Sequence, residues 1–225
     1  MDPKSLKTSW KQRIVIALIA ILLLGSTIAM YAAIVLSNGK GKTSTSELED
    51  QYTDKQAEIN DYAATLSKEY FPTFSKFRSE VKAYNAAAAN STGVHTRDLL
   101  EGTGRELATG DLEYYAYYIG FCPDETIFDS SFNDKDNPTE LIAPIYAGRG
   151  LIEGWNMGVV GMKIGGVREI QMPGEQAYGE TREICGMTNS PLKFIVMAVE
   201  DAKLNELNSE LDQIYAELVS KYYNQ

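Results

Sequence analysis

The chain has 225 residues, of which 44% are hydrophobic and 23% charged, and its formal net charge is −10 at pH 7. This length and apolar content allow one substantial core with accessory structure, while the acidic balance argues against nucleic-acid binding, which needs a basic face. Two cysteines are too few for a zinc site, and His95 has no partner histidine, so we expect no metal and no cofactor.

An apolar run close to the N-terminus is the first predicted element. A basic flank, residues 1–13, precedes an uncharged run over residues 14–36. At about 1.5 Å per residue, a helix of this length spans a hydrocarbon core of about 30 Å. A cleaved signal peptide is the alternative, because "GSTIAMYA" offers small residues for cleavage, but signal h-regions are typically about 7 to 15 residues long. We expect an uncleaved transmembrane helix, with residues 1–13 cytoplasmic and the C-terminal domain outside, at the cell surface or in a periplasm-like space.

A polar linker and a long helix are predicted next. The tract "SNGKGKTSTS" is small and polar, which is typical of a flexible linker, here residues 37–45. Ser46 and Glu49 form a capping box, and apolar residues follow at near-heptad spacing. The pattern predicts a helix that runs to about Tyr70.

A second helix is predicted after a break at Pro72. Its apolar positions run from Phe74 to Tyr84, before the tract "NAAAANSTG". Two interpretations of the helical region 46–93 remain open. The helices pack on each other or on the globular domain, or they form a dimerisation stalk.

From about Val94 the pattern changes from helical to strand-like. Strands are predicted in the alternating segment "DLEYYAYYIGF", in "VREIQMP" after a Gly-Gly turn, and in "PLKFIVMAVE". Between them, "LIEGWNMGVVGMKIGG" is predicted to be a helix with an apolar stripe beside a glycine stripe, which would let the helix lie very close to a sheet. The apolar stripe consists of Trp155, Val159 and Met162. The glycine stripe consists of Gly154, Gly158 and Gly161. Strands with one short helix predict the α+β class.

The C-terminal segment 202–225 is predicted to be an amphipathic helix. Leucines recur on one face from Leu204 to Leu218. We expect this face to pack against the helices of the region 46–93 or against a second protomer, so a homodimer through the helical segments is a further expectation.

A set of aromatic residues, rather than a catalytic acid or base, is the main chemical feature of the sequence. The serines lack a plausible base for nucleophilic catalysis. Each aromatic alone is typical of core packing, but their order and spacing between turn signals are specific. The set consists of Tyr118, Phe128, Trp155, Tyr178 and Phe194, with Asp129 directly after Phe128.

Residues 94–201 resemble an FK506-binding-protein (FKBP) type peptidyl-prolyl isomerase domain. The resemblance rests on the segments "GTGRELATGDLEYYAYYIG", "IFDSSF", "GLIEGWNMGVVGMKIGG", "AYGE" and "NSPLKF". It implies a bent antiparallel sheet wrapped around one short helix, with a proline-binding pocket between helix and sheet and Trp155 as the floor of the pocket.

The same resemblance implies which residues line the pocket. It implies that the Ile152 N–H and the Tyr178 hydroxyl bind peptide carbonyls, and we expect Asp129 to orient Tyr118 by a hydrogen bond. The lining positions are Tyr118, Phe128, Asp129, Leu151, Ile152, Trp155, Tyr178 and Phe194.

The predicted rim of the pocket departs from the family pattern. Ile142 stands where an aromatic is usual, and the loop "ETREICGMTNSP", which contains Met187, lacks the usual histidine and Ile-Pro-Pro. We take Ile142 and Met187 as substrate-binding rim residues. Cys122 at a strand end and Cys185 in this loop are compatible with one disulfide in an oxidising compartment. The resemblance does not fix their separation, so two free thiols are the alternative.

These inferences predict a membrane-anchored, outward-facing prolyl isomerase that assists the folding of exported proteins. Its substrates would be proline-containing unfolded or exported polypeptides, and FK506-like macrolides are a further expected ligand class. It would act by desolvation and by stabilising a twisted amide in the aromatic pocket. A non-catalytic FKBP-fold chaperone or peptide-binding module is the alternative, and a structural scaffold in an envelope complex is a third class.

Overall fold

The structure is a computed structural model that describes residues 45–83, 93–110, 113–147 and 151–223. It divides into a larger unit, Ala57–Glu206, and a smaller unit that contains the described residues 45–56 and 207–223. None of the helices in this part of the chain combines the length and the apolar character that a membrane crossing needs. The predicted basic flank, the predicted transmembrane helix and nearly all of the linker lie outside the described residues.

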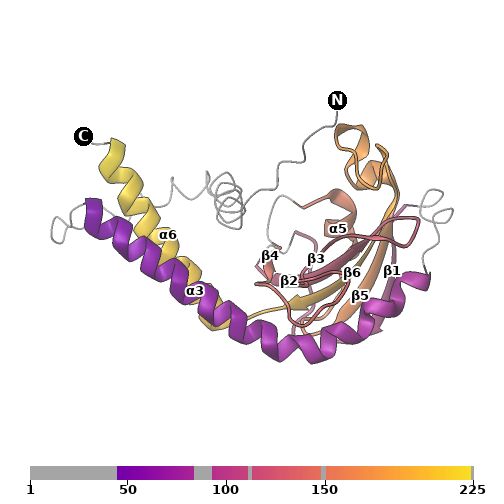
Figure 1. Ribbon diagram of the computed structural model, residues 1–225, viewed down its shortest axis with the longest axis horizontal. Coiled ribbons are helices and arrows are strands. Elements are labelled where there is room, and N and C mark those ends of the chain that lie inside the picture. The colour runs from indigo at the N-terminus through magenta and orange to yellow at the C-terminus, as the bar shows by residue number, and fades with distance from the viewer. Residues whose placement is uncertain (1–44, 84–92, 111–112, 148–150, 224–225) are drawn as a thin grey trace. The chain divides into compact units, whose positions relative to one another are not determined.

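The larger unit is built on one antiparallel sheet, which confirms the predicted α+β class (Figure 1). Among the described residues the strand order is β1-β5-β6-β2-β3, and the short β4 pairs with β2. The strands are β1 His95–Leu100, β2 Tyr115–Phe121, β3 Ile127–Ser130, β4 Ile145–Tyr146, β5 Val167–Met172 and β6 Leu192–Val199. Two short 3₁₀ helices, η3 Gly174–Gln176 and η4 Gly179–Thr181, connect β5 to β6.

The central strand β6 is buried on both faces of the sheet, along its whole length. Because successive side chains of a strand alternate between faces, its residues divide between two hydrophobic clusters. Phe194 and Val196 face α5, whereas Ile195 and Met197 face α3. The sheet therefore separates a side that packs against α5 from a side that α3 covers.

The helix α5, Glu153–Gly158, is only six residues long, so the longer helix predicted from the sequence is wrong beyond Gly158. The predicted close approach to the sheet is confirmed at two glycines. A Cβ built on Gly154 would lie 2.5 Å from the Met172 sulfur, and one on Gly158 would lie 2.4 Å from Ile170 Cγ2. Gly161 lies beyond the helix with a φ of +77°, so it serves a turn rather than the glycine stripe.

The helix α3, Thr45–Phe74, continues through Pro72, so the predicted break there is wrong. A proline so close to the C-terminus of a helix removes one backbone donor and disfavours the helical conformation of Phe71. The rings of Phe71 and Phe74 pack against Phe132, with centroid distances of 6.1 and 5.8 Å, and this packing stabilises the last turn. The predicted second helix is the 3₁₀ helix η2, Ser75–Ala83, which follows directly.

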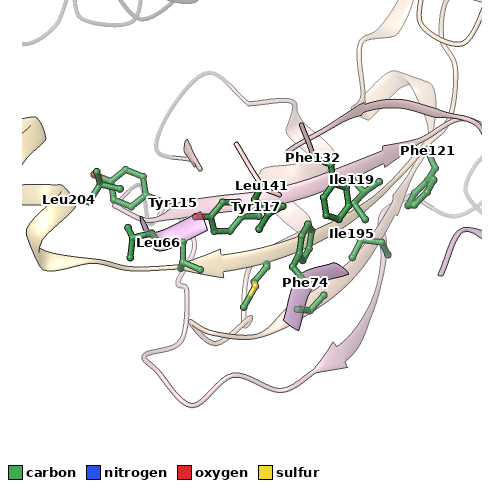
Figure 2. Packing of buried hydrophobic residues seen from close by; sticks show 13 residues of the cluster. Leu66, Phe74, Tyr115, Tyr117, Ile119, Phe121, Phe132, Leu141, Ile195 and Leu204 are labelled. Atoms are coloured by element: carbon green, nitrogen blue, oxygen red, sulfur yellow. The ribbon is translucent and has the colours of Figure 1, made fainter. Parts of the chain in front are cut away.

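The apolar face of α3 is buried on the sheet within the larger unit (Figure 2). Leu66 and Phe74 are buried there with Tyr117, and the Ser67 hydroxyl lies 3.2 Å from the Tyr117 hydroxyl. Of the two interpretations left open by the sequence, packing on the globular domain therefore describes this part of the helix. Self-association through the helices stays a prediction.

In the smaller unit, α3 and the C-terminal helix α6, Ala202–Tyr223, run antiparallel (Figure 1). Lys55 Nζ lies 2.7 Å from a Glu210 carboxylate oxygen. The rings of Tyr52 and Tyr215 lie 6.0 Å apart, and the Tyr222 hydroxyl donates to Glu49. The prediction that the C-terminal helix packs against the preceding helical region is confirmed by these contacts.

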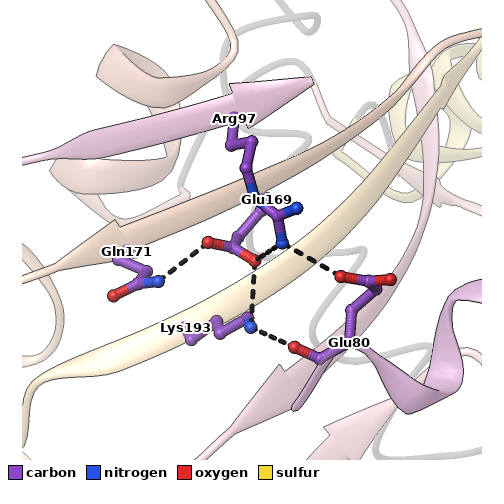
Figure 3. Close-up of polar contacts among 5 residues, drawn as sticks. All are labelled: Glu80, Arg97, Glu169, Gln171 and Lys193. Carbon is purple, nitrogen blue, oxygen red and sulfur yellow. Dashed lines mark hydrogen bonds and ion pairs between the residues drawn. The ribbon is translucent and has the colours of Figure 1, made fainter. Parts of the chain in front are cut away.

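A polar cluster on the α3 side of the sheet connects η2 to three strands (Figure 3). Lys193 of β6 is fully buried, and its ammonium lies 3.0 Å from a Glu169 oxygen and donates to the Glu80 carbonyl. Arg97 donates to Glu169 at 2.8 Å and to Glu80 at 2.9 Å, while Gln171 donates to the other Glu169 oxygen at 2.8 Å. Glu169 is therefore the anion that makes burial of the Lys193 charge tolerable.

The stability of the fold should depend on the ionisation of Glu169. Burial alone would raise the pKa of Glu169, but Arg97, Lys193 and Gln171 hold it below its usual value of 4.5. A carboxyl with a lowered folded-state pKa contributes stability that is complete above its unfolded value and is lost as the pH falls through its folded value. We expect the free energy of unfolding, measured by urea titration, to fall below about pH 4.5, in part through this group.

The variant Glu169→Gln should lower the free energy of unfolding at pH 7 by about 3 kcal/mol, because it leaves the buried Lys193 ammonium without a carboxylate partner. It should also flatten the acid part of the stability curve. Glu101→Gln is the matched control, since Glu101 is 75% exposed in its pair with Lys163. If the free energy of unfolding falls equally at acid pH in Glu169→Gln and in wild type, Glu169 is not the group responsible.

Candidate functional site

Trp155 of α5 forms the buried floor of an aromatic cluster on the α5 side of the sheet. Its indole N–H donates to the Tyr114 hydroxyl at 3.0 Å, so the polar atom of the ring is satisfied away from the cluster. The indole meets Phe194 and Tyr118 edge to face, with centroid distances of 5.4 and 5.8 Å. These contacts fix the orientation of the indole ring and hold one side of it against the sheet.

Phe128 of β3 supplies a wall of this cluster because a glycine lies beneath it. Gly120 of β2 pairs in register with Phe194 of β6, and a Cβ at residue 120 would lie 2.7 Å from the Phe128 ring. Phe128 meets Phe194 edge to face at a centroid distance of 5.7 Å. The missing side chain at Gly120 therefore gives the Phe128 ring its place over the sheet.

Tyr118 and Asp129 form the polar side of the cluster. The Tyr118 hydroxyl donates to Asp129 Oδ2 at 2.7 Å, which is the hydrogen bond expected from the sequence. The other carboxylate oxygen accepts the Ser130 N–H at 2.9 Å. Burial and the neighbouring Asp129 charge raise the pKa of Tyr118 far above its usual value, so the phenol stays protonated and donates throughout the physiological range.

Two hydrogen-bond donors next to the cluster have no acceptor among the described residues. Ile152 precedes α5 with an extended backbone, and its carbonyl accepts the N–H groups of Trp155 and Asn156, while its own N–H has no described partner. The Tyr178 hydroxyl also has none, although its ring packs against the cluster and lies 5.0 Å from the Arg182 guanidinium. Burial raises the pKa of Tyr178, which keeps this hydroxyl protonated as well. Both groups can donate to the carbonyls of a bound chain.

The remaining predicted residues divide between the cluster and its surroundings. Leu151 is partly buried against the cluster, as Ile152 is. The two predicted rim residues are about half exposed, Ile142 at 51% and Met187 at 52%, so neither is packed into the cluster. The Ile142 carbonyl accepts a hydrogen bond from Ser67 of α3.

The loop that carries Met187 is tied to the sheet by a disulfide. Cys122, directly after β2, is bonded to Cys185, with Cα atoms 5.6 Å apart. Of the two alternatives that the sequence left open, the bridge rather than two free thiols is present in the structure. Ile184 and Cys185 pack against the hydrophobic residues on the α5 side of the sheet, which include the aromatic cluster, so the disulfide holds this part of the loop on that side.

Sequence reasoning missed Tyr114 and Gly120, which contact the rings of the cluster, and Arg168, which is buried on the same side of the sheet. A signal for the first two was present, because residues 114, 118 and 120 share the even positions of one strand pattern and hence one face of the sheet. Arg168 had no such signal, since a lone arginine in a strand pattern gives no indication of what it contacts. The described residues contain no group of three or more His, Cys, Asp or Glu side chains that could hold a metal ion.

The chain is similar to known proteins of one family. Residues 104–199 match the family model of the FKBP-type peptidyl-prolyl cis-trans isomerase. An FK506-binding protein of Neisseria meningitidis serogroup A is 40% identical over 109 residues, which cover 48% of this chain and 94% of that protein. FK506-binding protein 4 of Gibberella zeae is 33% identical over 171 residues, which cover 73% of this chain. The match spans only 32% of the length of that fungal relative.

Among solved structures, a peptidyl-prolyl cis-trans isomerase from Pseudomonas syringae is similar to this chain. It is 22% identical with a TM-score of 0.38, and the match covers 62% of this chain and 93% of that one.

The disulfide should contribute strongly to stability, because it closes a loop of 63 residues in sequence. Chain-entropy arguments give about 4 kcal/mol for a loop of this size. We expect the reductant TCEP to lower the free energy of unfolding in urea by about this amount. The double variant Cys122→Ser/Cys185→Ser should show the lowered stability without reductant and no further response to TCEP. An equal response to TCEP in this double variant would contradict the prediction.

Proposed function

The chain belongs to the FKBP-type peptidyl-prolyl cis-trans isomerase family, and from this premise we propose that residues 94–201 isomerise X-Pro peptide bonds in the pocket over Trp155. One observation carries the proposal. Three aromatic rings, those of Tyr118, Phe128 and Phe194, meet one another and the buried Trp155 indole edge to face or tilted. The carboxylate beside them, Asp129, accepts the hydrogen bond of the Tyr118 hydroxyl.

The physics of the reaction suits such a site. An X-Pro bond isomerises unaided in tens to hundreds of seconds, because rotation must break amide resonance. The planar amide carries a charge separation that the twisted amide loses, so an apolar pocket disfavours the planar form relative to the twisted one. Donation from the Ile152 N–H and the Tyr178 hydroxyl would hold the peptide while the bond rotates.

Proline-containing unfolded or exported polypeptides are the substrates in this proposal, and FK506-like macrolides are ligands of the same pocket. The name of the Neisseria relative, FK506-binding protein, supports the macrolide part. The uncharged run 14–36 after a basic flank supports an anchor with the domain outside the membrane. The Cys122–Cys185 bridge also favours an oxidising compartment.

A non-catalytic peptide-binding module is the second candidate, and the exposed rim favours it. Ile142 and Met187 are half exposed, and such apolar rim residues could bind a chain without helping its rotation. A protease-coupled or NMR exchange assay of isomerisation on a proline peptide separates the two functions. Binding without acceleration would select the module.

Loss of the Phe128 wall should lower turnover more than peptide affinity. Phe128→Ala removes apolar surface that favours the twisted amide, so we expect kcat to fall while KM changes little. Tyr178→Phe deletes one hydrogen bond, so the rate should fall by a few-fold to about tenfold. Tyr146→Ala is the matched control, because this aromatic is 54% exposed and packs on Tyr115, which faces the α3 side. An unchanged kcat in a folded Phe128→Ala would overturn the mechanism.

The rate of isomerisation should be nearly independent of pH between about 6 and 8. The pKa values of Tyr118 and Tyr178 are both raised, so neither phenol loses its proton in this range. Measurement of kcat/KM across the range on a peptide without titratable groups tests this. A bell-shaped profile would indicate a proton transfer that the proposal does not contain.

The proposed topology predicts which part of the chain an external protease can reach. Protease added to intact cells should digest the globular domain and spare the first residues, because the basic flank is expected to stay inside. A cytoplasmic protein and a lysed sample serve as controls for membrane integrity. Full protection of the domain in intact cells would reverse the proposed orientation.

A further inference from the structure

Arg168 of β5 is a buried cation on the α5 side of the sheet, and the proposed mechanism does not use it. Its side chain is 8% exposed. Its guanidinium forms a fork with Asp98 of β1, with Nε 2.6 Å from Oδ1 and Nη2 3.0 Å from Oδ2. The third nitrogen, Nη1, donates to the carbonyls of Gly158 at 3.1 Å and Val160 at 2.8 Å.

These two carbonyls lie at the C-terminal end of α5. The last carbonyls of a helix lack intrahelical donors, and a cation is favourable there because of the helix dipole. Arg168 supplies both the donors and the charge. Gly158 also lies against Ile170 of the same strand β5, so the end of α5 is fixed to β5 by packing and by hydrogen bonds together.

Trp155 is one turn of helix away from this attachment. The Val159 N–H donates to the Trp155 carbonyl at 3.1 Å, and Gly158 and Val160 flank Val159. A displacement of the end of α5 would therefore move the backbone that carries the indole. A chain of contacts therefore connects Asp98, through Arg168 and the end of α5, to Trp155.

The ion pair of Arg168 with Asp98 is a poor source of stability, because Asp98 is 51% exposed and removal of the Arg168 charge from water is costly. A planar guanidinium is nevertheless a strong geometric constraint, because its donors point in fixed directions and here serve a carboxylate and two carbonyls at once. We propose that Arg168, held by Asp98, is a positioning residue that sets the depth of Trp155 in the pocket. The proposal deepens the isomerase function and rests on it.

The test uses the full chain in a Trp10→Phe background, so that Trp155 is the one remaining tryptophan of the two. In Arg168→Met and Asp98→Asn we expect KM for a proline peptide to rise about three- to tenfold. The value of kcat per folded molecule should stay within about twofold of wild type, because the floor contacts the substrate in the ground state and the transition state alike. The acrylamide quenching constant of Trp155 should rise at least about twofold, as for a ring that loses fixed contacts. Arg168→Lys should recover part of both effects, since it keeps the charge without the fork.

Arg97→Met is the matched control. It removes an arginine from the same strand as Asp98, but on the opposite face of the sheet, where its partners are Glu80 and Glu169 rather than α5. KM and quenching should stay at wild-type values in this variant. Equal changes in Arg97→Met would overturn the proposal, because they would reflect a general loss of stability.

A purely structural Arg168 would lower the folded fraction, and thus the apparent kcat, while KM and the quenching of Trp155 stayed unchanged, and this result would also overturn the proposal. If Arg168→Met does not fold, KM and the acrylamide quenching of Trp155 in the milder variant Asp98→Asn test the proposal instead. If the wild-type chain shows no isomerisation, the proposed function fails, but the quenching comparison still decides whether Arg168 positions Trp155.

Discussion

The close approach of α5 to β5 is the constraint on which the aromatic cluster around Trp155 depends. Side chains at residues 154 and 158 would collide with Met172 and Ile170, so only glycine permits this distance. At this distance Trp155 reaches both the Tyr114 hydroxyl behind it and the Phe194 ring beside it. Glycine in a helix gives up about 0.5 to 1 kcal/mol relative to alanine. The two glycines thus make α5 less stable as a helix, but they allow Trp155 to contact the sheet.

Burial of the sheet on both faces makes the wall of the pocket rigid. Phe194 faces the pocket, while its neighbours Lys193 and Ile195 are buried on the α3 side, so the strand is held from both directions. The two buried cations of the sheet also hold strands to neighbouring elements. Lys193 connects the strand to η2, and Arg168 connects the next strand to α5. Each is paired with a carboxylate, which is the condition for burial of a charge.

Much of this architecture follows from local patterns in the sequence. The alternation in "DLEYYAYYIGF" and the glycines beside Trp155 predict a strand and a closely packed helix, because both depend on side-chain period and size alone. The continuation of α3 through Pro72 and the early end of α5 could not be predicted in this way. The first depends on contacts with Phe132, far away in sequence, and beyond the end of α5 the Val160 carbonyl accepts a hydrogen bond from Arg168 of β5. Long-range packing decides both, and a local pattern contains no information about it.

The same dependence on geometry explains why the rim can differ from the family pattern while the aromatic cluster remains complete. In the proposed mechanism the site transfers no proton, so it would act only through the relative free energies of the planar and the twisted amide. In the proposed mechanism the Phe128 wall affects that difference, whereas the Trp155 floor, the Ile152 N–H donor and rim residues such as Met187 act on both forms alike. The position of this donor is fixed, because the Ile152 carbonyl accepts hydrogen bonds from the first turn of α5. One short helix, α5, thus sets both the position of this donor and the depth of Trp155. A contact that moves α5 would therefore act on peptide binding by the donor and on the apolar floor together.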